Sequence, residues 1–438
     1  MRVAIINTVI GTGSVGRIAC GTADEIINNG GSALLCRGRG EAIEGYENYR
    51  IGSDPDMFLH GIMTRITDKH GLYSRNATHR LIHRLEEYDP DIIQLHNIHG
   101  YYANYPILFD WLRSCGKPIV WTLHDCWAFT GHCVHYEYCG CTKWVRRDVT
   151  DSANDGENTE RSSGDGRIEE RPIEGCFDCP EKSEYPASYI KDASKSNYAI
   201  KKDRFTGIPN LHLVTPSEWL RDAVSRSFLS EYPVQVINTG IDLDIFKPSS
   251  SDIREKYGIG DKILLLGIAN PWRERKGFND FAELHGMLEE KDPGRYAIAL
   301  IGPQNPRQIE LPEDIIRLGF TDSVQELAEW YSTADIYVNL TYGDTFPTTN
   351  IEALACGTPV ITYDAGGSGE IVDEATGMII EKGNLEAVIG AIEKLTDSIN
   401  TEDYVNRNKD MAESCVNRSK LYRKQDKYRE YHELYKKV

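Results

Sequence analysis

The chain has 438 residues, 40% of them apolar, and a formal net charge of −18. This length exceeds the size at which one hydrophobic core usually keeps growing, so we expect two domains. The acidic surplus excludes nucleic acid as an expected partner and allows at most peripheral association with an anionic membrane, because both surfaces need a basic face.

The N-terminal sequence lacks the pattern of an export signal. Polar residues soon interrupt the apolar run after Met1, and no stretch of about 18 apolar residues occurs elsewhere. We therefore expect a cytoplasmic protein, placed at the inner face of the cytoplasmic membrane if its acceptor is lipid-linked. In that reducing compartment, the 11 cysteines are expected to be thiols or metal ligands.

Short runs rich in Val and Ile alternate with longer amphipathic stretches along the chain. This alternation is typical of strand–helix units that build a parallel sheet. The first series of expected strands lies at 2–9, 32–37, 91–97, 118–124, 211–216 and 234–238. The second series lies at 262–269, 296–302, 336–341 and 359–363.

The two series are separated by a stretch with the Gly, Pro and Ser content of a linker, ending at Ser251. The sequence therefore predicts an α/β protein with two Rossmann-like, doubly wound domains at 1–243 and 244–415. Residues 416–438 combine Tyr and Leu at helical spacing with many charges, which predicts a closing amphipathic helix.

A glycine-rich loop, Gly11-Thr12-Gly13-Ser14-Val15-Gly16, follows the first expected strand and opens a helix. Free backbone N–H groups at such a position favour a phosphate. Cys36-Arg37-Gly38-Arg39 stands where a dinucleotide fold usually has its ribose-binding acid, which would suit the 2′-phosphate of NADP. The loop alone fits an NADP-dependent oxidoreductase, another anion-facing loop or a plain tight turn.

A cysteine-rich module spans 126–180 and contains an insertion, 146–174, that we expect to be mobile because it has few large apolar residues. Cys139-Gly140-Cys141 and Cys176-Phe177-Asp178-Cys179 resemble the paired arms of a structural zinc site. The predicted zinc ligands are Cys133, Cys139, Cys176 and Cys179. Cys141 or a histidine could replace one of these four ligands.

Two other interpretations of this module remain open. The cysteines could be ordinary free thiols. A zinc deaminase is the other, suggested by His135-Tyr136-Glu137 upstream of the Cys176 pair, although that pattern needs a proline where Gly175 stands.

The segment Trp272-Arg273-Glu274-Arg275-Lys276-Gly277 follows the first strand of the second domain. Cations at the C-terminal edge of a parallel strand are well placed to bind a pyrophosphate. A solvated charge run is the alternative. The flanking Pro271 and the helix expected after Gly277 favour a ligand site.

The stretch from Gly343 to Ile361 predicts a short helix with its N-terminal amides at the sheet edge, because Pro347 stands at its start and Gly-Thr-Pro leads into the next strand. Asp344 precedes this helix, and Glu352 lies in its second turn. A carboxylate there can accept both hydroxyls of a ribose. An N-cap carboxylate with a surface Glu is the alternative.

This stretch, with Arg273 and Lys276, resembles the donor-site signature of family 4 of the retaining GT-B glycosyltransferases. The likeness is strongest to enzymes of bacterial capsule, exopolysaccharide and colanic-acid-like assembly. It implies two Rossmann-like domains facing a central cleft, with the closing helix returning to the N-terminal domain. Further matching segments lie at 11–16, 95–102, 121–125, 215–220, 238–242 and 318–321.

The resemblance also implies roles in donor binding. Arg273 and Lys276 would neutralise the diphosphate, Glu352 would hold the ribose, and Phe320 would lie near the base. The family has Glu where this chain has Asp344, so the contact to the donor sugar is one methylene shorter. The other implied donor-site residues are Gly13, Thr345, Phe346, Pro347, Thr348 and Thr349.

On the acceptor side the resemblance implies that His124 faces the sugar, and we expect Asp125 to orient it. No covalent nucleophile stands out, so we expect same-face attack without a catalytic metal or other cofactor, in which Asp344, Arg273, Lys276 and His124 act on the reacting sugar and its leaving group. Ser14, His96 and His99 complete the acceptor side. The expected partners are a UDP- or GDP-linked sugar and a glycan or lipid-linked acceptor.

Two functional alternatives stay open at this point. One is the NADP-dependent oxidoreductase built on the Gly11 loop, and the other is a relative that binds nucleotide sugars without catalysis.

Overall fold

The computed structural model describes residues 1–146, 159–160, 171–172, 175–304, 309–396 and 402–438. The predicted insertion 146–174 therefore lies almost entirely outside the described residues. The chain divides into two compact units, the first made of Met1–Ile237 with Arg429–Val438 and the second of Asn238–Tyr428. None of the helices in the described part is long and apolar enough to cross a membrane.

The first unit is built on a seven-stranded parallel sheet of order β3-β2-β1-β4-β5-β8-β9. Its strands are β1 (Arg2–Asn7), β2 (Ser32–Arg37), β3 (Glu47–Arg50), β4 (Ile92–Leu95), β5 (Ile119–Thr122), β8 (Leu211–Thr215) and β9 (Val234–Val236). Its helices are α1 (Gly13–Asn28), α2 (Asp54–Thr67), α3 (Arg75–Tyr88), α4 (Tyr105–Ser114), α5 (Ser194–Phe205) and α6 (Glu218–Ser225). A separate antiparallel pair joins β6 (Thr159–Glu160) and β7 (Arg171–Pro172).

The second unit has a six-stranded parallel sheet of order β12-β11-β10-β13-β14-β15. Its strands are β10 (Ile263–Ile268), β11 (Tyr296–Ile301), β12 (Ile316–Leu318), β13 (Ile336–Asn339), β14 (Val360–Tyr363) and β15 (Gly377–Ile380). Its helical elements are α7 (Ile253–Lys256), η1 (Glu274–Lys276), α8 (Phe278–Lys291), α9 (Val324–Thr333), α10 (Thr348–Ala355), α11 (Leu385–Thr396), α12 (Glu402–Ser419) and η2 (Lys420–Tyr422). The final helix, α13 (Lys424–Tyr435), begins in this unit and ends in the first.

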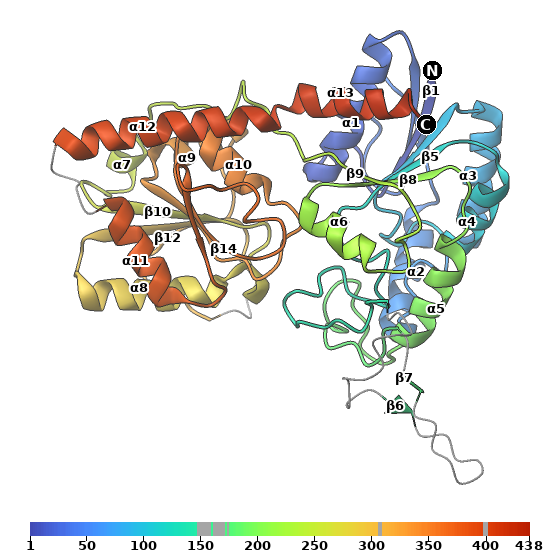
Figure 1. Cartoon of the computed structure of the whole chain (residues 1–438), viewed down its shortest axis with the longest axis horizontal. Coiled ribbons are helices and arrows are strands. Elements are labelled where there is room, and N and C mark those ends of the chain that lie inside the picture. The colour runs from blue at the N-terminus through green and yellow to red at the C-terminus, as the bar shows by residue number, and fades with distance from the viewer. Residues whose placement is uncertain (147–158, 161–170, 173–174, 305–308, 397–401) are drawn as a thin grey trace. The chain divides into compact units, whose positions relative to one another are not determined.

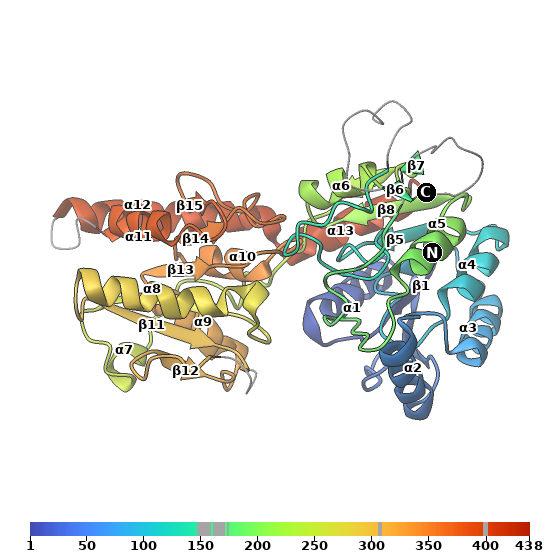
Figure 2. The same cartoon turned by 90° about the horizontal axis from the view of Figure 1, so that it is seen from below.

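Helices cover both faces of each sheet (Figures 1 and 2). Alternate residues of a buried strand therefore enter different cores. In β10, Ile263 and Leu265 pack in one core with α8 and α11, whereas Leu264 and Leu266 pack in another with α9 and α10. This burial on both faces explains the continuous apolar runs that predicted the strands.

All ten predicted strands are present, so the doubly wound α/β architecture is confirmed. Within the two parallel sheets, the sequence missed β3, β12 and β15. Each has only three or four residues and lies at or beside a sheet edge, with polar or partly exposed positions. Such short runs do not stand out from loops by periodicity.

The expected single helix at 416–438 is wrong in detail. The chain instead ends α12 at Ser419, turns through η2, and starts α13 at Lys424. The break coincides with a backbone pairing in which Ile241 N–H donates to the Tyr422 carbonyl and Lys424 N–H donates to the Ile241 carbonyl. This pairing satisfies backbone groups that the interrupted helix leaves open.

The last turns of α13 pack in the first unit, as expected for a closing helix. Tyr431, Leu434 and Tyr435 share a buried core with α1. Tyr435 hydroxyl lies 2.8 Å from the side-chain oxygen of Gln94, and Thr122 hydroxyl lies 3.2 Å from that of Tyr431. The end of the helix is thus held by both apolar burial and buried hydrogen bonds.

Candidate functional site

The cationic segment after β10 is fixed by its neighbours rather than free in solvent. Trp272 is buried, and its indole N–H donates to the Ile301 carbonyl at 3.1 Å. Gly277 has a φ of +74°, and a Cβ there would lie 2.3 Å from the Leu340 carbonyl oxygen. Only glycine fits so close an approach. The segment is therefore held against the loop that follows β13.

Lys276 and Asp344 form an ion pair at this contact. The ammonium lies 2.5 Å from Asp344 Oδ2, and the two side chains are 22% and 21% exposed. Asp344 Oδ1 accepts the Phe346 N–H at 3.2 Å, and the guanidinium of Arg275 donates to the Gly343 carbonyl. A cation is thereby held beside the turn that enters α10, where helix amides and the helix dipole also favour an anion.

Glu352 lies in the second turn of α10, as the sequence predicted. It is 8% exposed, and Oε2 accepts the hydroxyl of Tyr331 on α9 at 2.9 Å. Burial, followed by the charge of Glu352, raises the pKa of Tyr331 well above its usual value. The phenol therefore stays protonated and fixes one carboxylate oxygen. Sequence reasoning missed Tyr331, which carries no motif of its own.

The other predicted donor-side residues fall into two groups. Thr345, Phe346 and Pro347 are buried, whereas Thr348 and Thr349 are partly exposed at the start of α10. The Phe346 amide is already committed to Asp344. The expected anion-binding amides around Phe346–Thr349 therefore do not include that of Phe346 itself.

Two further predicted donor ligands are exposed. Arg273 precedes η1, and Phe320 follows β12 with 69% of its surface exposed. Both lie at ends of strands in the second unit's sheet, in connections where ligands of open α/β sheets gather.

In the first unit, His96 and His124 follow the adjacent strands β4 and β5. His96 Nδ1 lies 3.0 Å from His124 Nε2, and the rings stack with centroids 5.2 Å apart. Burial lowers the pKa of His124 to about 4 and that of His96 well below its usual value. Both rings are therefore neutral at neutral pH, so one donates the shared proton and the other accepts it.

Asp125, which follows His124 directly, bonds a second histidine. Its Oδ2 lies 2.9 Å from His99 Nε2, while His124 is bonded to His96. Burial would raise the pKa of Asp125, but His99 and the Trp127 N–H outweigh it and lower the pKa to about 2. His99 Nδ1 also lies 3.1 Å from Tyr185 hydroxyl. Asp125, His99 and Tyr185 thus form a chain, and the orientation of His124 by Asp125 stays a prediction.

The glycine-rich loop opens α1 as predicted, with Gly13 and Ser14 exposed at the helix start. Gly11 N–H donates to the Gly16 carbonyl at 3.0 Å, which closes the turn. Arg37 is buried, and its Nε donates to the Gly40 carbonyl at 3.1 Å. That contact uses one of the N–H donors that a 2′-phosphate could bind.

The cysteine module shows only part of the predicted metal arrangement. The neighbouring Cys133 side chain lowers the pKa of Cys179 to about 7. Cys139 instead donates to the Tyr136 carbonyl at 3.3 Å. In the part of the chain that the structure describes, the one group of three or more His, Cys, Asp or Glu ligand atoms within 4.8 Å of one another is His285, Glu289 and Asp314. Zinc binding by Cys133, Cys139, Cys176 and Cys179 stays a prediction.

Comparison with protein families identifies the second unit. Residues 261–398 match the family described as glycosyl transferases group 1 and form such a domain. This range holds both the cationic segment and the whole Asp344–Glu352 stretch. The Lys276–Asp344 contact therefore lies inside the matched domain.

Two curated relatives are similar to parts of the chain. A D-inositol 3-phosphate glycosyltransferase of Paenarthrobacter aurescens is 27% identical over 186 residues, which cover 40% of this chain and 46% of the relative. The putative colanic acid biosynthesis glycosyl transferase WcaC of Escherichia coli is 23% identical over 313 residues, 67% of this chain and 64% of the relative. The matched segments thus span about half to two thirds of these relatives.

Solved structures share the fold over the full chain. Sucrose-phosphate synthase from Thermosynechococcus elongatus has a TM-score of 0.69 at 14% identity, covering 100% of this chain and 98% of the other. Anabaena Alr3699/HepE in complex with UDP-glucose has a TM-score of 0.63 at 13% identity, with both chains fully covered. The chain has the GT-B fold, with two Rossmann-like units.

Proposed function

We propose that this chain is a retaining glycosyltransferase that moves a sugar from a UDP- or GDP-linked donor onto a glycan or lipid-linked acceptor of a bacterial surface polysaccharide. One observation carries the proposal. A group 1 glycosyl transferase domain holds Lys276 at 2.5 Å from Asp344, beside the start of α10, and places Glu352 one turn further along that helix.

The donor's nucleotide would be held by groups with complementary chemistry. Lys276 and Arg273 supply positive charge for the diphosphate, and the first amides of α10 add hydrogen-bond donors. Glu352 can accept the ribose hydroxyls through its carboxylate. The Tyr331 hydroxyl donates to Oε2 and so fixes the plane of that carboxylate. The GT-B neighbour HepE is known with UDP-glucose, which supports a UDP-linked donor.

The reaction would proceed by same-face attack. The bond between the acceptor oxygen and the sugar's anomeric carbon forms as the bond from that carbon to the diphosphate oxygen breaks. The acceptor's proton passes to the leaving diphosphate, whose growing charge Lys276 and Arg273 stabilise without a metal. Asp344 would accept a hydroxyl of the transferred sugar, and neutral His124 would hydrogen-bond the sugar from the first unit.

The acceptor is proposed from the relatives and from the first unit's polar groups. Relatives named for colanic acid and for lipopolysaccharide core biosynthesis support a surface glycan precursor. Ser14, exposed at the start of α1, and the His96, His99 and Asp125 group would contact or shape the acceptor.

Nucleotide binding tests the donor half. Wild-type protein should be stabilised against thermal unfolding by UDP or GDP, because a ligand that binds only the folded state raises its stability. Lys276→Ala and Glu352→Ala should weaken this shift strongly, whereas Lys291→Ala, an exposed lysine on α8, should retain it. Saturable NADPH binding without UDP or GDP binding would instead support the oxidoreductase.

A transfer assay tests catalysis. Donors that stabilise the protein are incubated with lipid-linked glycan precursors, and NMR of the product should show the donor's anomeric configuration retained. Nucleotide binding without turnover on any donor would leave a binding protein, and an inverted product would contradict the proposed same-face attack.

A further inference from the structure

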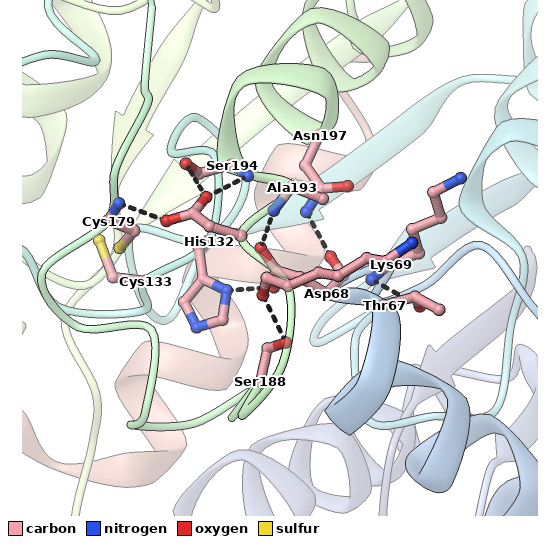
Figure 3. A network of polar contacts seen from close by, with 12 residues as sticks. Thr67, Asp68, Lys69, His132, Cys133, Cys179, Ser188, Ala193, Ser194 and Asn197 are labelled. Carbon is pink, nitrogen blue, oxygen red and sulfur yellow. Dashed lines mark hydrogen bonds and ion pairs between the residues drawn. The ribbon is translucent and has the colours of Figure 1, made fainter.

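The cysteine module is the largest group of metal-ligating side chains that the proposed transfer does not use. Three of its segments carry cysteines that approach one another: 131–133, 141–144 and 176–179. The first and second segments each contact the third. Figure 3 shows Cys133 and Cys179 from this group.

The first segment lies directly against the third. A Cβ at Gly131 would lie 2.6 Å from Cys176 Cβ and 2.3 Å from the Ser194 carbonyl oxygen, so only glycine allows this approach. Figure 3 shows the Cys133 and Cys179 side chains close to each other, and their proximity is also felt in the pKa of the Cys179 thiol. Both cysteines of the Cys176–Cys179 arm thus meet the segment that carries Cys133.

The second segment is tied to the same arm by the residue between its cysteines. Lys143 Nζ donates to the Phe177 carbonyl at 3.0 Å and lies 3.8 Å from the centre of the Phe177 ring. Trp144 is buried, and its indole N–H donates to the Cys141 carbonyl at 3.0 Å. Cys141 is therefore held beside the Cys176–Cys179 arm.

Cys139 is less suited to the same centre. Its thiol donates to the Tyr136 carbonyl at 3.3 Å, so this side chain is engaged by its own turn. Cys139 and Cys141 therefore differ in their contacts, although only Gly140 lies between them in the sequence.

A buried cation lies beside these sulfurs. Lys201 is 1% exposed, and its ammonium donates to the Trp127 and Thr130 carbonyls at 2.6 and 3.0 Å. Among the described residues it has no carboxylate within ion-pair distance. Burial lowers the pKa of Lys201 to about 7, and the nearby Cys176 and Cys133 side chains act in the opposite direction. A buried ammonium needs negative charge nearby, and zinc with four thiolates carries a net charge of −2.

We infer that Cys133, Cys141, Cys176 and Cys179 bind a structural Zn²⁺ that joins the three segments of the module. Four sulfurs at about 2.3 Å from zinc stand roughly 3.8 Å apart. No three ligand atoms of the described module lie within 4.8 Å of one another, so metal binding must draw the sulfurs inward. The thiols release their protons as zinc binds.

Elemental analysis of the tag-free full chain tests this assignment. Wild-type protein should contain one zinc per chain, and Cys141→Ser and Cys176→Ser should lose it. Cys139→Ser is the matched control, because it removes a neighbouring thiol outside the assigned set, and it should keep the metal. Loss of zinc in Cys139→Ser with retention in Cys141→Ser would overturn the assigned ligands.

If the cysteine variants fail to fold, cobalt substitution in wild-type protein still tests the site. Wild-type protein exchanged into Co²⁺ should show sulfur-to-cobalt charge transfer and the visible bands of a tetrahedral thiolate site. A metal-free protein, or a Cys133–Cys179 disulfide detected by mass spectrometry, would overturn the inference. UDP or GDP binding measured on the same preparation separates this outcome from failure of the proposed transferase function, because the nucleotide groups belong to the second unit.

Discussion

The ion pairs of the two units differ in how deeply they are buried. In the second unit, Lys276 and Asp344 meet at a loop beside a helix start with about a fifth of each side chain exposed. In the first unit, Asp68 and His132 form a fully buried pair at 2.5 Å, with both side chains 0% exposed (Figure 3). Asp68 also accepts the Ala193 N–H at 2.7 Å.

This difference separates groups placed for a ligand from groups placed for the fold. A partly exposed ion pair contributes less to stability than a buried one, so its charges can turn to a substrate at lower cost. A buried pair with several hydrogen bonds leaves a costly uncompensated charge when one partner is removed. Substitutions in the second unit should therefore change binding first, and substitutions in the first unit should change stability first.

The largest expected effect is at the buried pair. Asp68→Ala should lower the free energy of unfolding of the first unit by about 4 kcal/mol, because His132 and the Ala193 amide lose their acceptor inside the protein. Urea titration followed by circular dichroism measures the change. Asp222→Ala, which removes an exposed carboxylate on α6, is the control and should change stability by less than about 0.5 kcal/mol. Equal effects of the two variants would show that the buried Asp68–His132 pair does not stabilise the first unit more than an exposed carboxylate does.

The next effect is on nucleotide binding. Lys276→Ala should weaken UDP or GDP binding about 100-fold, because the diphosphate loses a charge-assisted hydrogen bond worth roughly 2.7 kcal/mol. Its unfolding midpoint should stay close to that of wild type. Isothermal titration calorimetry measures the affinity, with Lys291→Ala as the control. A Lys276→Ala protein that binds nucleotide normally would place the diphosphate elsewhere.

The neutral histidine pair makes the first unit sensitive to acid. The pKa of His124 is about 4 in the folded state, below the value of about 6.5 expected on unfolding. The unfolded chain therefore binds more protons between these values, so this contribution is present above pH 6.5 and is lost as the pH falls toward 4. By pH 5 the loss amounts to about 2 kcal/mol.

His124→Gln should remove that loss. The difference in unfolding free energy between pH 7 and pH 5 should shrink by about 2 kcal/mol relative to wild type. His83→Gln, at an exposed position on α3, should leave the difference unchanged. An unaltered pH dependence in His124→Gln would show that the buried ring does not titrate as its surroundings indicate.

Sequence reasoning was most successful where one short stretch carries both the fold and the chemistry. Pro347 and the Gly-Thr-Pro after α10 predicted the bounds of the helix. Those bounds in turn predicted that Asp344 precedes the helix and that Glu352 lies in its second turn. Sequence reasoning did not foresee that Asp125, which follows His124 directly, bonds His99. His99 follows β4 and Asp125 follows β5, so their contact depends on the pairing of these two strands.

Tertiary contacts between distant elements account for the rest. Tyr331 is 21 positions before Glu352 and lies on a different helix, so their contact depends on how α9 packs beside α10. The same holds for Asp68 and His132, which come from the end of α2 and from the cysteine module. Neither pair has a spacing or motif that marks it before the fold is known.

The smallest effect is expected at Tyr331. Tyr331→Phe keeps the ring that packs in the core but removes the hydroxyl that holds Glu352 Oε2. The carboxylate would still be able to accept ribose hydroxyls, with its orientation less restricted, so UDP or GDP binding should weaken only about tenfold, or roughly 1.4 kcal/mol. Tyr257→Phe, at a partly exposed ring beside Trp330, is the matched control.

A deoxy nucleotide shows whether the effect passes through the ribose. Wild-type protein should prefer UDP or GDP over the 2′,3′-dideoxy form, and Tyr331→Phe should narrow that preference while leaving binding of the dideoxy nucleotide nearly unchanged. A uniform loss for both nucleotides would mean that Tyr331 supports the packing of α9 and α10 rather than the carboxylate. In that case Tyr331 would not position Glu352, and the expected separation between binding groups and fold-supporting groups would fail inside the second unit itself.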